Sequence, residues 1–245
     1  MNPNRRLAVA TGVLFITATV ADLLGAAVRP DLTGTHYLTQ VSAQGDRVAA
    51  GVLLLLIAAF ACAGIAVSMY PILRKANAGL ALGSVVFRTI EAVMYVIEVL
   101  SLLSLLTLGQ QLVSAGTAER ASLGVVGGLL LSLREHATLA GVFAFCLGAF
   151  LYYCAFLQSR LIPRWLSGWG IAAIILMTTA AVLALFNNDA VTSYVPLALP
   201  IFLQEMVMAI WLIAKGFSPS AVRSDDLSVT KPAIPALDDH APVAA

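Results

Sequence analysis

Six apolar segments, each long enough to cross a lipid bilayer, constrain this chain more than any other feature. They lie at residues 7–28, 48–70, 80–108, 137–157, 166–186 and 196–214. A hydrocarbon core about 30 Å thick needs about 20 mostly apolar residues in a helical span. Apolar residues make up 60% of the 245 residues and charged residues only 11%, which excludes a soluble enzyme, a disordered chain and a nucleic-acid binder. The sequence therefore predicts an all-α, polytopic membrane helix bundle with six transmembrane helices.

Basic residues are distributed unevenly between alternate loops. Nine lie at the N-terminus, in the second and fourth loops and after the last span, against four on the opposite side. The nine are Arg5, Arg6, Arg74, Lys75, Arg160, Arg164, Lys215, Arg223 and Lys231, and the four are Arg29, Arg47, Arg120 and Arg134. Because cytoplasmic loops carry an excess of lysine and arginine, we expect both termini to be cytoplasmic.

The chain divides into a membrane domain and a tail. We expect residues 1–217 to form one six-helix transmembrane domain. Residues 218–245 are rich in Pro, Ala, Ser and Asp without apolar periodicity, which is typical of a disordered tail. A seventh apolar run, residues 121–133, is too short to cross a bilayer. It is typical of an interfacial segment, a re-entrant segment or an extension of the fourth span.

The third span carries a polar stripe along one helix face. Its members are separated by steps of 4, 3, 4 and 3 residues, and they are Ser84, Arg88, Glu91, Tyr95 and Glu98. At about 100° per residue these positions share one face. An ionisable residue inside a span is costly and usually faces the protein interior with a partner. We therefore expect this stripe to face the bundle as a buried polar seam.

Depth along the spans predicts two groups within this seam. A central group would join Arg88 and Glu91 to Glu205 of the sixth span, where Gln204 lies at a similar depth. An outer group would contain Asp22 of the first span, Glu98, Arg134 and His136. The full set of candidate binding residues is Arg88, Glu91, Glu98, Glu205, Gln204, Asp22, Tyr95, Arg134 and His136.

Acids outnumber bases in the spans. The spans contain four acids, namely Asp22, Glu91, Glu98 and Glu205. They contain one arginine, Arg88, or two if Arg134 is included. Buried carboxyl groups without partners take up protons, so we expect at least one acid to be protonated near neutral pH. One hypothesis is that the seam binds or conducts a small polar solute, ion or proton. The alternative is a structural or regulatory membrane protein whose buried ion pairs only fix helix packing.

Other chemistries find little support in the sequence. No nucleophile–base pair, nucleotide motif or metal-ligand motif is present, so an intramembrane enzyme is the least favoured class, and we expect no cofactor and no metal site. Cys62, Cys146 and Cys154 lie in apolar runs and are expected to be reduced.

The composition also limits which partners the protein can bind. Membrane lipids are the expected partners. A net charge of +1 provides no basic patch for nucleic acid. A small ligand and the oligomeric state are left open.

Phe150, Tyr152 and Tyr153 are expected to face lipid or the membrane interface.

Several stretches resemble a family of bacterial membrane proteins across Arg5 to Phe217. They are Tyr70-Pro71-Ile72-Leu73, Gly79-Leu80-Ala81-Leu82-Gly83, Phe87-Arg88-Thr89-Ile90-Glu91, Pro163-Arg164-Trp165-Leu166-Ser167-Gly168-Trp169-Gly170, and Leu197-Ala198-Leu199-Pro200 with Gln204-Glu205-Met206. On these residues the chain resembles the uncharacterised bacterial family catalogued as domain of unknown function 4386. The resemblance implies a multi-pass protein of the bacterial cytoplasmic (inner) membrane. It supplies no catalytic residues.

Overall fold

The computed structural model describes residues 3–34 and 36–218, and this part of the chain is helical without a strand. Six helices are long and apolar enough to cross a membrane, which confirms the predicted all-α membrane bundle. The tail predicted for residues 218–245 lies, apart from its first residue, outside the described residues. In chain order the elements are α1 (Pro3–Val28), α2 (Tyr37–Ala43), α3 (Gly45–Ala76), α4 (Ala78–Ser114), α5 (Thr117–Ser159), α6 (Arg164–Asn187), the 3₁₀ turn η1 (Val191–Tyr194) and α7 (Val195–Ala214).

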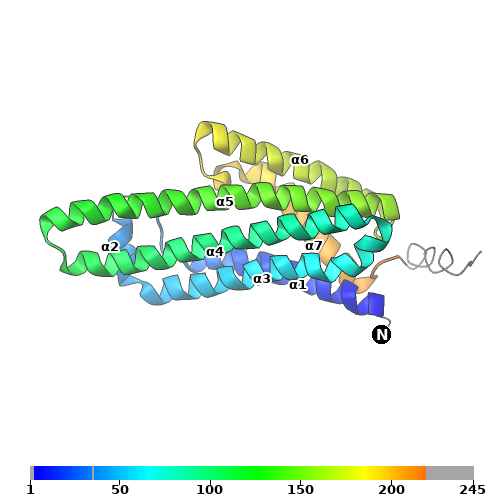
Figure 1. Ribbon diagram of the computed structural model, residues 1–245, viewed down its shortest axis with the longest axis horizontal. Coiled ribbons are helices and arrows are strands. Elements are labelled where there is room, and N and C mark those ends of the chain that lie inside the picture. Colours follow the sequence, from blue (N-terminus) through cyan, green and yellow to red (C-terminus); the bar gives the residue numbers. More distant parts are fainter. Residues whose placement is uncertain (1–2, 35, 219–245) are drawn as a thin grey trace, which may run out of the picture.

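The six long helices run alongside one another (Figure 1), and their contacts close into a ring. Each packs against the long helix before it and the one after it in the chain, and α7 packs against α1. Such an up-and-down arrangement needs only short connections, and it gives every helix one face toward the ring interior. Polar side chains that lipid would not tolerate can therefore gather inside the ring.

The chain termini define one end of the bundle, which we call the terminal end. Arg5, in the first turn of α1, donates hydrogen bonds to the carbonyl oxygens of Leu212 (2.9 Å) and Ala214 (3.3 Å) at the end of α7. The last carbonyl groups of a helix have no partner within it and carry partial negative charge, so a guanidinium group stabilises them. We call the opposite end, where α1 finishes, the distal end.

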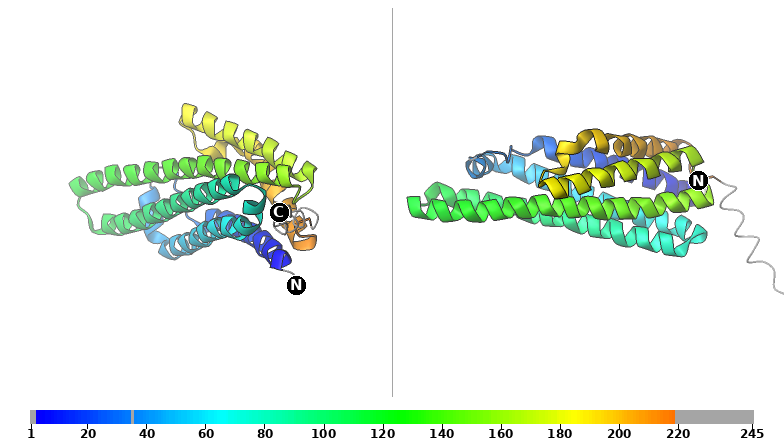
Figure 2. Two further views of the ribbon diagram at one scale, coloured as in Figure 1. Left: turned by 45° about the vertical axis from the view of Figure 1, so that its right-hand side comes forward. Right: turned by 90° about the horizontal axis from the view of Figure 1, so that it is seen from above.

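Helices α4 and α5 extend past the other helices at the distal end (Figure 2). Helix α5 is continuous from Thr117 to Ser159, so the short apolar run 121–133 extends the fourth span. The small helix α2 packs against α4. The α2 residue Tyr37 lies against Gly127 of α5, where a Cβ would come within 2.6 Å of its hydroxyl oxygen. Sequence analysis did not predict α2, because a helix of seven residues has too few positions to show a period.

Helices α1 and α7 pack tightly against each other, and this contact completes the ring. A Cβ at Gly12 would lie 2.6 Å from the backbone oxygen of Ala209 and 2.7 Å from Cγ1 of Ile213. Glycine therefore allows the two backbones to approach, as small residues commonly do between membrane helices.

We expect Gly12→Ala to lower the stability of the bundle by about 1–3 kcal/mol, because the added methyl group must push α7 away from α1. Thermal unfolding of the purified protein in detergent measures this change. Gly124→Ala is the matched control, since no heavy atom lies within 4 Å of a Cβ at that position. Equal melting temperatures for Gly12→Ala and the wild type would contradict the close α1–α7 contact.

Candidate functional site

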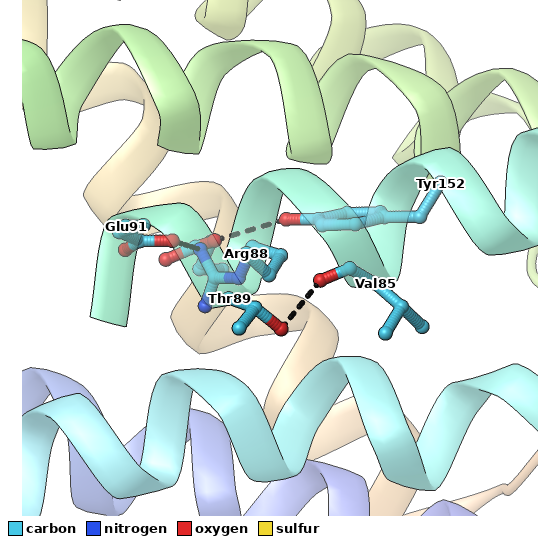
Figure 3. A network of polar contacts seen from close by, with 6 residues as sticks. Val85, Arg88, Thr89, Glu91 and Tyr152 are labelled. Atoms are coloured by element: carbon cyan, nitrogen blue, oxygen red, sulfur yellow. Dashed lines mark hydrogen bonds and ion pairs between the residues drawn. The ribbon is translucent and has the colours of Figure 1, made fainter. Parts of the chain in front are cut away.

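A buried ion pair lies in the ring interior on α4. Arg88 Nη1 is 2.9 Å from Glu91 Oε2, and the two side chains are only 2% and 7% exposed. Residues three apart on a helix share one face, which brings the two charges together (Figure 3). Arg88 also lies over the ring of Phe145 on α5, 5.2 Å from its centroid. The guanidinium group thus gains a cation–π contact in addition to its carboxylate partner.

Two neighbouring tyrosines of α5 contact two neighbouring polar residues of α7. The Tyr152 hydroxyl donates to Glu205 Oε1 at 3.0 Å, and the Tyr153 hydroxyl donates to Gln204 Oε1. Gln204 Nε2 donates in turn to the backbone oxygen of Leu166, in the first turn of α6, at 3.0 Å. Figure 3 shows Tyr152 pointing toward Arg88. We call Arg88, Glu91, Tyr152, Tyr153, Gln204 and Glu205 the central cluster.

The positions of Tyr152 and Tyr153 correct the prediction that they face lipid or the membrane interface. Both are fully buried, at 0% exposure, whereas Phe150 is exposed. Their hydroxyl groups point inward because α7 offers Glu205 and Gln204 as acceptors. Apolar periodicity could not reveal this, since the partners lie about 50 residues further along the chain.

Two glycines provide the space that these large side chains occupy. A Cβ at Gly148 of α5 would lie 3.1 Å from Cγ of Arg88. A Cβ at Gly170 of α6 would overlap the ring of Tyr153. The side chains of Arg88 and Tyr153 therefore fit only because α5 and α6 carry glycine where these side chains pass.

The hydrogen bonds of the central cluster are incomplete within the described part of the chain. Arg88 Nε, Glu91 Oε2 and the hydroxyl of Ser84, one turn before Arg88, are buried without a hydrogen-bond partner. Arg88 and Glu91 are thus in contact at ion-pair distance, but their orientation does not make a hydrogen bond. Nearly all buried polar groups in proteins are paired, so this cluster has capacity for a further donor or acceptor.

A second group of ionisable side chains lies toward the distal end. Asp22 of α1 lies near Tyr95 of α4 and within electrostatic reach of Arg29 and Arg134. Arg134 Nη2 of α5 is 4.0 Å from Glu98 Oε2 of α4. We call these five residues the distal cluster.

Sequence analysis missed Arg29 as a member of this cluster and counted it only as a loop charge. Arg29 directly follows α1 and is partly buried. Burial lowers the pKa of its guanidinium group, and the positive charge of Arg134 lowers it further. The spacing contained a usable signal, because Arg29 lies seven residues after Asp22 and two helical turns return to the same face.

His136 is not brought into the distal cluster. It is exposed on α5, two residues after Arg134. Two helical steps rotate a side chain by about 200°, so His136 and Arg134 face opposite directions. The other candidate binding residues all lie in one of the two clusters.

Fold and site together define a multi-pass helical membrane protein whose interior holds two clusters of ionisable side chains. Residues 10–216, from α1 through α7, match the model of the family described as Domain of unknown function (DUF4386). The chain belongs to this family, as its sequence resemblance indicated. No curated protein and no solved structure matches the chain.

The ion pair predicts a strong coupling between Arg88 and Glu91. We expect Arg88→Met to destabilise the bundle by about 3 kcal/mol or more, because it leaves a buried carboxylate without its partner. The double variant Arg88→Met/Glu91→Gln should recover more than half of this loss, since it removes both charges. Unfolding in detergent, titrated with denaturant, measures both effects.

Thr89→Val is the control for this double-mutant cycle. Thr89 is exposed on α4, and its hydroxyl donates to the backbone oxygen of Val85 at 2.8 Å (Figure 3). Its stability should stay close to that of the wild type. Equal stabilities for Arg88→Met and the double variant would show that the two charges do not depend on each other.

Proposed function

We propose that this membrane protein binds protons in the central cluster and conducts them along the buried seam between the two clusters. The observation that carries the proposal is the surplus of carboxyl groups beside Arg88. The central cluster holds two carboxyl groups, Glu91 and Glu205, against one guanidinium group. One bound proton makes this group neutral, and a neutral group costs far less to bury than a net charge.

Tyr95 provides the connection between the two clusters. The buried apolar side chains form two separate core clusters, and Tyr95 packs against both of them. Asp22 of the distal cluster and Glu91 of the central cluster both lie within electrostatic reach of its ring hydroxyl. A hydroxyl group can donate and accept a hydrogen bond at once, which suits a relay between two carboxyl groups.

The seam continues from the central cluster toward α6. Glu205 and Gln204 are neighbours on α7, and the Gln204 amide reaches the backbone of Leu166 in the first turn of α6. Chains of acidic side chains form proton pathways in membrane pumps and transporters, and Glu205 here accepts a hydrogen bond from the Tyr152 hydroxyl. The proposal therefore assigns protons to the seam in preference to a larger solute, because protons need no open channel.

The proposed location is the cytoplasmic membrane of a bacterium, with both termini in the cytoplasm. The bacterial assignment rests on the family resemblance, and the orientation rests on the basic residues. Four segments at the terminal end carry basic residues. They contain Arg5, Arg74, Arg160 and Lys215, respectively. The positive-inside rule then places the terminal end in the cytoplasm and the distal end outside.

Proton flux into liposomes tests this function. The purified protein is reconstituted into vesicles that contain a pH-sensitive dye, and a potassium gradient with valinomycin imposes an inside-negative potential. We expect the wild type to acidify the vesicle interior several times faster than protein-free vesicles. Glu91→Gln should reduce the rate to that of protein-free vesicles, because the amide cannot bind a proton in the same way.

Glu135→Gln is the matched control, because Glu135 is exposed on α5 beside the distal cluster. This variant should conduct protons as the wild type does. Melting temperatures recorded for the same preparations separate loss of conduction from loss of fold. Conduction by Glu91→Gln at the wild-type rate would contradict the proposal, and so would a wild-type rate equal to that of protein-free vesicles.

A further inference from the structure

Two arginine side chains toward the distal end each have a donor group without a partner among the described residues. Within the described part of the chain, Arg29 Nη1 and Arg134 Nε are buried and have no hydrogen-bond partner. Each positive charge lies within electrostatic reach of the other. Two positive charges this close repel each other, and an anion bound by both would offset the repulsion and accept the free hydrogen bonds.

The acids of the distal cluster do not take up this capacity. Glu98 is 4.0 Å from Arg134, the limit of an ion pair, and no hydrogen bond joins the two side chains among the described residues. Asp22 makes no ion pair with Arg29 within that distance in the same part of the chain. Both carboxyl groups thus lie near the arginines without occupying their free nitrogen atoms.

The backbone holds Arg29 in position for such a contact. The amide of Arg29 donates to Gly25 O at 3.4 Å, which continues α1 by one residue. Arg47 Nε donates to the backbone oxygen of Val28 at 2.9 Å and so ties the end of α1 to α3. The Arg29 side chain then crosses Gly51 of α3, where a Cβ would lie 2.5 Å from its Cγ. The glycine is therefore needed for this path.

We propose that Arg29 and Arg134 form a binding site for a phosphate group at the distal end of the bundle. Planar guanidinium groups donate paired hydrogen bonds that match phosphate oxygens. Arg29 follows the last turn of the first span, and Arg134 is 17% exposed, so the site lies where headgroups and water reach the protein. The phosphate comes from a lipid headgroup or from free phosphate. The site shares the distal cluster with the proposed proton pathway, but its binding test does not depend on conduction.

Ligand-dependent stabilisation tests the site. The full chain, purified in a phosphate-free maltoside detergent, is melted with inorganic phosphate or with short-chain phosphatidylglycerol. Sodium chloride at equal ionic strength and short-chain diacylglycerol, which lacks phosphate, are the reference probes. We expect at least one phosphate-bearing probe to raise the melting temperature. A rise with phosphate alone identifies a free anion, a rise with the lipid alone identifies a headgroup, and a rise with both shows that either source is accepted.

Three variants tie the effect to the site. Arg29→Gln and Arg134→Gln should each weaken binding about tenfold or more, the change that loss of one charge-assisted hydrogen bond produces. Glu98→Gln should strengthen binding, because it removes a competing negative charge. Arg164→Gln is the control, since it removes the same charge from an exposed position on α6.

Gly51→Ala keeps every charge and displaces the Arg29 side chain, so it tests the site if Arg29→Gln fails to fold. It should also weaken binding. The proposal is overturned if no phosphate-bearing probe raises the melting temperature more than its reference. It is equally overturned if the rise persists in Arg134→Gln and in either variant that affects Arg29.

Discussion

The structure depends on the cost of holding a charge inside a lipid-surrounded bundle. Arg88 cannot lose its proton, so its charge must be matched within the ring. Glu91 supplies the match from the next turn of the same helix, at 2.9 Å. The face of α4 toward the ring, the glycine at position 148 of α5 and the inward direction of Tyr152 all follow from the need to enclose this pair.

The two clusters solve the same problem with different charge ratios. The central cluster has two carboxyl groups for one guanidinium group, so a proton completes its neutrality. The distal cluster has two of each, namely Asp22 and Glu98 with Arg29 and Arg134, but they are loosely arranged. The loose arrangement leaves Arg29 Nη1 and Arg134 Nε without hydrogen-bond partners among the described residues, and it is these donors, not a surplus of charge, on which the proposed phosphate site rests. Tyr95, packed against both apolar cores, lies between them.

Sequence alone could predict the spans and the polar face of α4, because both follow from local rules. Length and hydropathy define a transmembrane helix, and a period of 3.6 residues groups Arg88, Glu91 and Glu98. Depth along antiparallel helices also placed Glu205 beside Arg88. The inward direction of Tyr152 and Tyr153 could not be predicted in this way, because it depends on contacts between helices distant in sequence.

Arg29 was harder to predict than the other members of the distal cluster, because it lies just beyond the end of a helix. Arg29 follows the last residue of α1, and only the path across Gly51 brings its side chain into the cluster. His136 was grouped with Arg134 by depth alone, but depth does not determine the direction in which a side chain points. The short helix α2 and the length of α5 likewise depend on packing between α2, α4 and α5.

We propose that Glu91 and Glu205 share one proton beside Arg88. Infrared spectroscopy of the protein in lipid at neutral pH measures this directly in the carbonyl-stretch region of protonated carboxylic acids. The account predicts one such band in the wild type and its loss in Glu91→Gln and Glu205→Gln alike, because the remaining carboxylate then pairs with Arg88. A wild-type spectrum without the band, or a band that survives in both variants, would contradict it.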